Sequence, residues 1–437
     1  MPETLTPAEG AARLRPRDEL GVPLATGQPP ALMAALGERD DWEELRVYTA
    51  LLAVGTALFN HPGVHYLSGF FGPIERALRD AGANISFAPA DFRRFEPLLA
   101  EQAPRVMATA AAPPDAEGWC SLSLHAGAHI GELHRAGADR DRLLIVEASE
   151  RFPRTFGLPP EHPHAIHLDE IDLLVRSDAA PLPLPDPEPG DADRAIAEHA
   201  AAFIPAEATI QTGFGGVPSM IAALLAEREG GGYGVHTEMV TDGLMRLHEA
   251  GKVANRKGLF DGVSVATFAA GSEELYRWLD GNREVAFLPV EVINAPELIA
   301  RNRSMVTING ALAVDVQGQV VADTIAGSQY SGIGGHEDFV AGPALSLEQR
   351  SLLCLPSTTS VDGGLRSRIV PFFDAGAVIT TPRHQVDVIV TEFGAAELQG
   401  KTTHRRGEAL AAIAHPDFRE GLLEAAARSS GGRSPRP

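Results

Sequence analysis

The chain has 437 residues, 44% of them hydrophobic and 22% charged, which is enough for two ordinary domains or one large α/β unit with a full core. Its formal net charge of −21 offers no overall basic field to a nucleic acid backbone, so we expect no nucleic acid partner. The two cysteines, Cys120 and Cys354, lie far apart and form no CxxC pair, which excludes a disulfide framework and a cysteine zinc site. With no signal-peptide pattern at the start and no apolar run long enough to span a bilayer, we expect a cytoplasmic protein and no membrane partner.

The first half of the chain predicts strands that alternate with helices. Residues 1–20 are polar without a sustained apolar period, and we expect them to form a loose lead-in. Residues 47–54 fit a buried strand and a buried helix equally well. The alternation predicts a mostly parallel sheet covered on both faces. The other predicted elements are a helix at 31–36, helical spacing at Ile74, Ala77 and Leu78, and strands at 85–87, 106–109 and 143–147.

A proline-rich segment predicts the domain boundary. Five prolines stand at alternate positions between Pro181 and Pro189, which excludes a helix and a central strand, so residues 178–193 are interpreted as an extended linker. It separates an N-terminal α/β domain, residues 1–177, from a C-terminal α/β domain, residues 194–428. The last residues, 429–437, are Ser, Gly, Arg and Pro, and we expect them to be disordered.

The second half repeats the alternation of strands and helices. Asp242 is placed to cap a helix that ends at Gly251. Two such α/β halves suggest a pseudo-repeated architecture, although the two halves show no convincing sequence similarity to each other. The other predicted elements are helices at 195–203 and 218–229, a strand ending near Val235, and strands at 208–211, 262–268, 305–308, 311–316 and 386–391.

Two glycine-rich turns are the first candidates for a binding site. One runs from Gln211 to Pro218 and contains Gly213, Gly215 and Gly216; the other runs from Ser331 to Gly335. Glycine turns expose backbone N–H groups, which can hold a phosphate at a helix start or stabilise an oxyanion. The first turn does not match GxGxxG, and no acidic ribose ligand is obvious, so a tight strand-to-helix turn explains it as well as a nucleotide site does.

Glu238 lies between these turns in sequence, and a carboxylate with such neighbours suggests a nucleophile beside an oxyanion site. The same Glu238 also fits a helix-entry residue, and His236 fits a packed strand-end histidine better than a base. A serine hydrolase is excluded because the chain has no GxSxG elbow. Without HExxH and without clustered histidines, we expect no metal site.

Several segments of the chain together resemble those of a known family. Its segments are similar to those of the acetyl-CoA hydrolase/transferase family, the class I CoA-transferases that include 4-hydroxybutyrate and butyrate/acetate CoA-transferases. The resemblance covers most of residues 205–420, and is looser in the first half, chiefly at Pro113-Pro114-Asp115, Gly118 and Pro153-Arg154. The matching segments in the second half are residues 234–243, 305–315, 329–335, 355–358, 367–370, 380–384 and 414–419.

The resemblance implies a pair of related open α/β domains with mostly parallel sheets and the active site between them. It implies transfer of CoA between carboxylates, here expected to be short-chain acids, with CoA as a co-substrate, no other cofactor, and a homo-oligomeric enzyme. Glu238 matches the family's catalytic glutamate, which forms an acyl anhydride and then a CoA thioester. The matching CoA-binding positions are Gly213, Phe214, Gly215, Gly216, Val217, Ala313 and Gly335, and candidates for the oxyanion or substrate pocket are Gln211, Gly332, Gly334 and His336.

Two departures from the family pattern point to a different acyl pocket. The family often carries Gln where His336 stands and Arg near Ala341, and an Asn-containing stretch where this chain has Glu147-Ala148-Ser149. Three alternatives stay open. One is an acyl-CoA hydrolase, in which water intercepts an intermediate. A second is a nucleotide-binding oxidoreductase, indicated only by the turn at 213–216. The third is a catalytically silent CoA-binding protein, which the presence of Glu238 disfavours.

Overall fold

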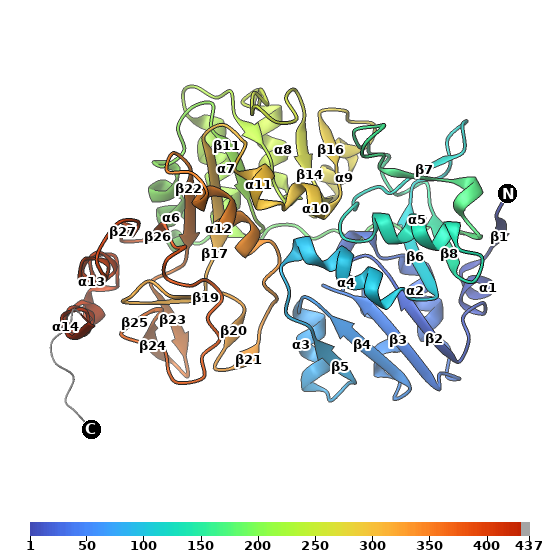
Figure 1. Ribbon diagram of the computed structural model, residues 1–437, viewed down its shortest axis with the longest axis horizontal. Coiled ribbons are helices and arrows are strands. Elements are labelled where there is room, and N and C mark those ends of the chain that lie inside the picture. The colour runs from blue at the N-terminus through green and yellow to red at the C-terminus, as the bar shows by residue number, and fades with distance from the viewer. Residues whose placement is uncertain (430–437) are drawn as a thin grey trace. The chain divides into compact units, whose positions relative to one another are not determined.

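A computed structural model describes residues 1–429 of the chain (Figure 1). Contacts divide it into two compact units, each described here by itself. Unit 1 contains residues 1–185, 237–242 and 263–295, and unit 2 contains the rest of the described chain. The predicted domains are continuous ranges, and the predicted C-terminal one contains Glu238. In the structure, the segment with Glu238, residues 237–242, packs with unit 1 instead. The domain ranges stay a prediction, and the predicted tail, residues 429–437, lies outside the described residues except for Ser429, which ends a helix.

Unit 1 is built on one open sheet in which every neighbouring pair of strands is parallel. The strand order is β1-β10-β8-β6-β2-β3-β4-β5. The strands are β1 (Glu3–Leu5), β10 (Leu173–Arg176), β8 (Leu143–Ala148), β6 (Val106–Ala111), β2 (Arg17–Gly21), β3 (Glu44–Thr49), β4 (Val64–Ser68) and β5 (Ile85–Phe87).

Helices cover both faces of this sheet, as the near-continuous apolar strands require. In β6, Ala108 packs in one core with Leu32 and Leu36. The residue before it, Met107, packs with Leu133 in the core on the opposite face of the sheet. This period of two places α2 on one face and α5 on the other (Figure 1). The helices are α1 (Pro7–Ala11), α2 (Pro30–Gly37), α3 (Pro73–Asp80), α4 (Phe95–Gln102) and α5 (Ile130–Ala138).

The prediction of a loose lead-in over residues 1–20 is wrong. These residues form β1, α1 and most of β2, which lies between β6 and β3 in the sheet and buries Leu20 completely. Elements of three to five residues are too short to show an apolar period, which is why the pattern failed there. The ambiguous residues 47–54 divide: Val47–Thr49 end β3, and the chain leaves the strand at Leu51, where φ is 43°.

The shorter elements of unit 1 include two pairs of strands and two helices from residues 237–242 and 263–295, the segments that return to this unit late in the chain. β7 (Trp119–Ser121) pairs with β9 (Ala165–His167) in antiparallel fashion. β13 (Met239–Val240) pairs with β15 (Phe268–Ala269), and β14 (Ser264–Ala266) with β16 (Val285–Phe287), both in parallel. Two helices, α9 (Glu273–Leu279) and α10 (Val290–Ile293), complete the returning segment.

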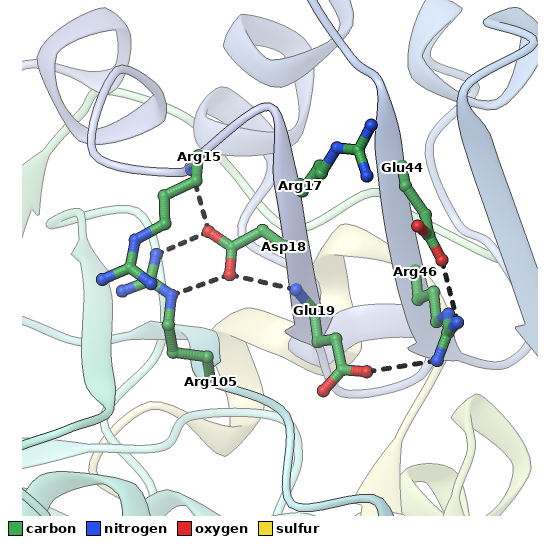
Figure 2. Close-up of a pocket in the computed structure, with 7 residues that line it drawn as sticks. All are labelled: Arg15, Arg17, Asp18, Glu19, Glu44, Arg46 and Arg105. Carbon is green, nitrogen blue, oxygen red and sulfur yellow. Dashed lines mark hydrogen bonds and ion pairs between the residues drawn. The ribbon is translucent and has the colours of Figure 1, made fainter.

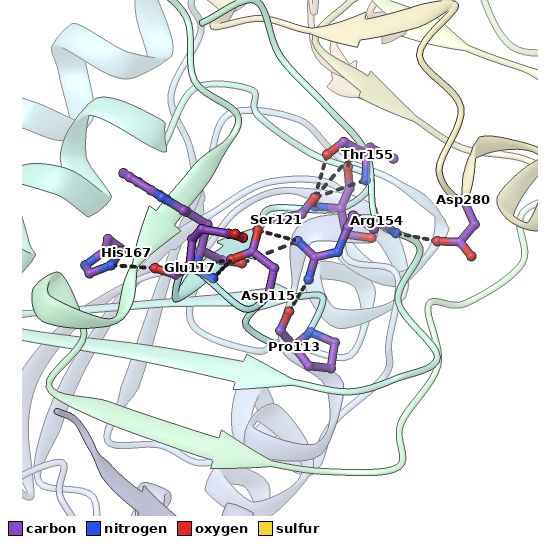
Figure 3. A network of polar contacts seen from close by, with 10 residues as sticks. Pro113, Asp115, Glu117, Ser121, Arg154, Thr155, His167 and Asp280 are labelled. Atoms are coloured by element: carbon purple, nitrogen blue, oxygen red, sulfur yellow. Dashed lines mark hydrogen bonds and ion pairs between the residues drawn. The ribbon is translucent and has the colours of Figure 1, made fainter. Parts of the chain in front are cut away.

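Arg154 ties several of these segments together (Figure 3). Its guanidinium donates to the carbonyls of Trp119, at 3.3 Å, and Pro113, and forms an ion pair with Asp115 at 3.6 Å. Its backbone N–H donates to the carboxylate of Asp280 at 2.8 Å. The first-half positions of the family resemblance, Pro113, Asp115 and Arg154, therefore form a single polar network that anchors loops of unit 1.

Unit 2 holds a second open sheet, with the order β12-β11-β17-β22-β26-β27. All its pairs are parallel except β26–β27, so the predicted fold class of two open, mostly parallel sheets is confirmed. The strands are β12 (Gly234–Val235), β11 (Thr209–Thr212), β17 (Met305–Gly310), β22 (Arg350–Cys354), β26 (Val388–Thr391) and β27 (Gly394–Glu397).

The helices of unit 2 begin close to the predicted positions. The helix expected at 195–203 is α6 (Asp191–Ala201), and the helix expected at 218–229 is α7 (Gly216–Glu227). A core that includes Leu353, Ile389 and Leu410 packs the sheet against α13. The other elements are α8 (Asp242–Glu249), α11 (Pro296–Ile299), β18 (Ala313–Asp315), β19 (Val320–Val321), β20 (Thr324–Ile325), β21 (Ser328–Gln329), α12 (His336–Ala344), β23 (Thr358–Val361), β24 (Gly364–Ser367), β25 (Ile369–Val370), α13 (Thr403–Ala412) and α14 (Arg419–Ser429).

Within residues 1–429, none of the helices combines the length and the apolar character that a membrane crossing requires. The cytoplasmic location and the homo-oligomeric state stay predictions.

The buried carboxylate of Glu75 gives a test of unit 1. It accepts hydrogen bonds from the backbone N–H groups of Leu52, at 2.6 Å, and Gly72, at 2.8 Å, and from the hydroxyl of Tyr66 at 2.9 Å. Glu75→Ala leaves these buried donors without their acceptor, so we expect the free energy of unfolding measured in urea to fall by about 2–4 kcal/mol. The same substitution at exposed Glu101 serves as the control. Equal, small effects at both positions would contradict the structural role of Glu75.

Candidate active site

Glu238 stands directly before β13 in unit 1, and its side chain is half-buried. Its backbone carbonyl accepts hydrogen bonds from the N–H groups of Thr267, at 2.9 Å, and Phe268, at 3.2 Å. The short parallel pairing of β13 with β15 continues this contact. The backbone of the predicted nucleophile is therefore held in place by the neighbouring strand.

The segment that contains Glu238 and its partner strand β15 lies near the carboxyl ends of the strands in the sheet of unit 1. Thr26, which follows the carboxyl end of β2, donates its hydroxyl to the carbonyl of Ala269 in β15 at 2.8 Å. Open parallel α/β sheets bind ligands at the carboxyl ends of their strands. Glu238 thus lies in the part of unit 1 where this architecture favours a binding site.

Asn294 fixes the carboxylate of Glu238. Its side-chain N–H group, on Nδ2, donates to Oε2 of Glu238 at 2.8 Å, and Asn294 is fully buried. Asn294 follows α10, and its backbone N–H donates to the carbonyl of Val290 at 2.8 Å. A hydrogen bond to an ionised carboxylate is stronger than one between neutral groups. Sequence reasoning missed Asn294; the only signal was a polar residue before Ala295 and Pro296, where a helix cannot continue unbroken.

The loop around Gly127 forms a further part of the surroundings of Glu238 in unit 1. The carbonyl of Gly127 accepts from the N–H of Val290 at 3.1 Å, and the N–H groups of Ala126 and Gly127 donate to the carbonyl of Thr267 at 3.0 and 3.1 Å. The loop therefore joins the element before Asn294 to the strand beside Glu238. His129 ends this loop, and burial lowers its pKa to about 3, so the ring is neutral at physiological pH.

The residue that follows Glu238 contacts an apolar cluster of unit 1. Met239, next to Glu238 in sequence, packs against a cluster that contains Ala25, Ala50, Phe268 and Val290. A cluster of this kind excludes water, which strengthens electrostatic interactions at its border.

In unit 2, the first glycine turn connects β11 to α7, and Gly215 has a φ of +128° that few residues with a side chain adopt. The Gly215 N–H donates to the carboxylate of Asp186 at 2.9 Å. A methyl group placed on Gly216 would lie 2.8 Å from a carboxylate oxygen of Asp193. Two carboxylates therefore stand at the start of α7, where an anionic ligand would otherwise be favoured. The ring of Phe214 is 47% exposed and can contact a ligand.

Parallel pairing brings two of the predicted CoA-binding segments to the same edge of unit 2. β11 and β17 are neighbours, so the turn from Gly213 to Val217 and the chain leading to Ala313 both follow carboxyl ends of adjacent strands. Gln211, a candidate for the oxyanion site, uses its side chain to bind β17: its carbonyl oxygen accepts from the N–H of Ile308 at 3.1 Å. Its amide also lies 3.3 Å from the side-chain oxygen of Asn309.

The second glycine turn is buried and leads into α12. Gly332, Gly334 and Gly335 are buried, and Gly334 has a φ of 56°. His336 is the first residue of α12, and its Nε2 lies 2.7 Å from the hydroxyl oxygen of Thr381. The roles of all these residues in binding CoA or an oxyanion, and the placement of the site between the two predicted domains, stay predictions.

A pocket of about 310 Å³ in unit 1 contains none of the predicted site residues (Figure 2). It lies at the amino ends of β2, β3 and β6, whereas Glu238 belongs to the carboxyl edge. Its charges largely pair with one another: Arg105 binds Asp18 at 2.5 Å, and Arg46 binds Glu44 at 2.8 Å. We therefore assign no ligand to it. The part of the chain that the structure describes also contains no cluster of three or more His, Cys, Asp or Glu side chains suited to a metal ion.

Comparisons with known proteins identify relatives of the chain and of its fold. Residues 271–426 match the family model described as the acetyl-CoA hydrolase/transferase C-terminal domain. A 4-hydroxybutyrate coenzyme A transferase of Clostridium kluyveri is 34% identical over 407 residues, which cover 91% of each chain. The crystal structure of RipA from Yersinia pestis is 32% identical with a TM-score of 0.88, and the match covers 98% of this chain and 97% of RipA. An acetyl-CoA hydrolase of Eremothecium gossypii is more distant, 26% identical over 58% of this chain and 49% of its own.

The contact between Asn294 and Glu238 predicts a catalytic defect. Asn294→Ala removes the donor to the carboxylate of Glu238, the predicted nucleophile, so we expect kcat for CoA transfer to fall about 100-fold, with a smaller change in KM. Asn84→Ala, at an exposed position of the same unit, is the matched control. Steady-state kinetics of both variants measure the effect. A kcat within a factor of two of the unmodified protein would contradict a role for Asn294 at the carboxylate.

The carboxylates at the start of α7 predict that removing a negative charge there tightens the binding of acyl-CoA. Asp186→Asn keeps an oxygen that can accept from Gly215 but removes a negative charge from the turn, so KM for acyl-CoA should fall about two- to fivefold if the turn binds an anionic part of CoA. The substitution is checked by substrate titration at low ionic strength, where the charge effect is least screened. An unchanged or raised KM would argue against CoA binding at this turn.

Proposed function

Because the chain belongs to the acetyl-CoA hydrolase/transferase family, we propose that it transfers CoA between short-chain carboxylic acids through covalent intermediates on Glu238. The observation that carries this proposal is the hydrogen bond from buried Asn294 to the carboxylate of Glu238 at the carboxyl edge of unit 1. The chain is an enzyme, and the activity its family supports is that of a CoA-transferase.

The first half-reaction moves CoA onto the enzyme. A carboxylate oxygen of Glu238 attacks the thioester carbonyl of the donor acyl-CoA, the carbon–sulfur bond breaks, and CoA leaves as a thiolate. The product is a mixed anhydride between the acyl group and Glu238. The thiolate then attacks the glutamyl carbonyl of this anhydride, the donor acid leaves as its carboxylate, and Glu238 carries CoA as a thioester.

The second half-reaction reverses these steps with another acid. The acceptor carboxylate attacks the glutamyl thioester and expels the CoA thiolate, which gives a second anhydride. The thiolate attacks the acyl carbonyl of that anhydride, so a new acyl-CoA leaves and the carboxylate of Glu238 is restored. No proton is gained or lost over the cycle, which is consistent with a site whose nearby His129 ring is neutral.

Asn294 supports both halves through one contact. While Glu238 is a carboxylate, Nδ2 of Asn294 holds it in one orientation. When the glutamyl carbon is attacked, the same N–H group can donate to the oxyanion that forms on Oε2. A well-aimed donor of this kind is worth about 3–4 kcal/mol in the transition state. Because a carboxylate is a weak nucleophile, the fixed geometry also supplies part of the rate.

The proposed substrate class rests on the relatives and on the apolar cluster. Similar enzymes include a 4-hydroxybutyrate CoA-transferase and a butyryl-CoA:acetate CoA-transferase. In this chain, Met239 and the cluster containing Ala25, Ala50 and Phe268 give the nucleophile an apolar flank suited to an aliphatic acyl chain.

Hydrolysis of acyl-CoA is the second candidate, because acetyl-CoA hydrolases are also among the relatives. In that reaction water replaces the acceptor acid. Attack on the acyl anhydride releases the free acid and the carboxylate of Glu238, with CoA leaving as its thiolate. Attack on the glutamyl thioester, from which the donor acid has already left, expels CoA as its thiolate and restores the carboxylate of Glu238; in both cases the proton lost by water goes to solvent or to the thiolate. The same Glu238 and the same loops serve both reactions, so the two differ in whether water reaches the intermediate.

Product analysis separates the two functions. Butyryl-CoA is incubated with isotopically labelled acetate, and labelled acetyl-CoA and free CoA are measured by mass spectrometry. We expect labelled acetyl-CoA to form with ping-pong kinetics and to exceed free CoA, and we expect Glu238→Ala to abolish its formation. If free CoA accumulates at the same rate with and without acetate, and no labelled acetyl-CoA forms, the protein is a hydrolase and the transferase proposal is wrong.

A further inference from the structure

Two arginines of unit 2 meet at one turn of the chain. The turn joins β18 to β19 and contains Gln317 and Gly318, which has a φ of 89°. A methyl group placed on Gly318 would lie 3.0 Å from Nη1 of Arg406 in α13, so the backbone of the turn runs close beside this guanidinium. Nη1 of Arg383 donates to Oε1 of Gln317 in a very short contact. Both guanidinium groups therefore lie against the same turn.

The segment that leads to Arg383 is held by its neighbours in unit 2. The N–H groups of Thr380 and Thr381 donate to one carbonyl of β19 at 2.9 and 3.1 Å. The hydroxyl of Thr380 donates to the carboxylate of Asp323 at 2.5 Å. The carbonyl of Asp323 accepts from the N–H of Ser331, at the start of the second glycine turn, at 3.0 Å. These contacts fix the backbone just before Arg383.

Arg406 is 9% exposed, and its hydrogen bonds go to backbone carbonyls. Nε donates to the carbonyl of Lys401 at 3.4 Å, and Nη1 donates to that of Arg383 in a very short contact. Nη2 has no hydrogen-bond partner in the described chain and keeps some contact with solvent. Carbonyl groups orient a guanidinium but do not neutralise its charge.

The two positive charges also act on each other. Burial, and after it the charge of Arg383, lowers the pKa of Arg406. A guanidinium still keeps its proton at physiological pH, so both charges remain. Bringing two like charges together and burying one of them is costly unless an opposite charge lies close by.

The neighbouring carboxylates do not supply that opposite charge. Within residues 1–429, neither Arg383 nor Arg406 has a carboxylate at ion-pair distance. Three carboxylates of nearby elements have other partners: Asp315 accepts from the N–H of Gln319 at 2.9 Å, Glu397 binds Arg350 at 2.8 Å, and Glu408 binds Arg405 at 2.9 Å. The first turn of α13 also has no acidic residue, although the helix dipole favours one there. In a chain with a net charge of −21, this is a local excess of positive charge.

We propose that Arg383 and Arg406 form a binding site for a phosphate group beside the turn at Gly318. A guanidinium offers several N–H groups in one plane, which match the oxygens of a phosphate. Nη2 of Arg406 and the exposed guanidinium of Arg383 are placed to donate to these oxygens. Their two positive charges balance the two negative charges of a phosphate monoester.

The phosphate has two possible sources. β18 begins at Ala313, a predicted CoA-binding residue, and leads into the turn with Gly318. Arg383 stands two residues after Thr381, which contacts His336 next to the second glycine turn. A phosphate of CoA is therefore one source, and this link rests on the proposed function. A free phosphate ion or a small phosphorylated metabolite is the other.

Isothermal titration calorimetry of the whole protein at low ionic strength tests the site with three probes: CoA, 3′-dephospho-CoA and inorganic phosphate. Arg383→Gln removes the charge of the exposed arginine and keeps the backbone carbonyl that binds Arg406. Arg405→Gln, at an exposed arginine of the same helix, is the matched control. We expect Arg383→Gln to raise Kd for at least one probe about fivefold or more, and Arg405→Gln to change it less than about twofold.

The pattern of losses identifies the source of the phosphate. A loss with CoA but not with 3′-dephospho-CoA assigns the site to the 3′-phosphate, and an equal loss with both assigns it to the diphosphate. A loss with inorganic phosphate alone assigns it to a separate ligand. If Arg383→Gln and Arg405→Gln have the same effect on all three probes, or none, the proposal is wrong. Binding of inorganic phosphate does not depend on CoA transfer, so this proposal and the proposed function can fail separately.

Discussion

The hydrogen bond from Asn294 to Glu238 is the constraint on which the rest of the proposed site depends. Its partners are 56 residues apart, and both belong to segments that return to unit 1 late in the chain. Backbone bonds from Thr267 and Phe268 hold the carbonyl of Glu238, and α10 holds Asn294. A weak nucleophile is useful only when its direction of attack is fixed, and these contacts fix it from both the main chain and the side chain.

The glycine turns of unit 2 are stabilised by side chains of other segments of the chain, which hydrogen-bond to residues in or next to each turn. Asp186 accepts from Gly215 in the first turn, whereas Thr380 and Thr381 hold the two ends of the second. Glycine allows the backbone conformations that these turns need but contributes no side-chain contacts of its own. Polar groups of the neighbouring segments therefore supply the rigidity. The buried ones, Thr380 and Thr381, depend on complete pairing because an unpaired buried group is costly.

Much of the architecture could be predicted because long β-branched and aliphatic runs, such as residues 143–147, show what a parallel sheet buries on both faces. The glycine turn at 213–216 and Glu238 were found from local patterns and from the family resemblance. Residues 1–20 were missed because β1, α1 and β2 are too short to show a period. Asn294 and Thr381 were not assigned their roles because their partners lie 56 and 45 residues away, and one sequence contains no sign of such contacts.

The proposed mechanism requires that Glu238 becomes covalently linked to CoA. The most direct measurement is mass spectrometry of the intact and digested protein after incubation with butyryl-CoA, with and without borohydride. We predict a CoA adduct on the peptide that contains Glu238, and its conversion by borohydride to the corresponding alcohol at that residue. If butyryl-CoA is consumed without any adduct, and Glu238→Ala consumes it at the same rate, the reaction does not pass through Glu238.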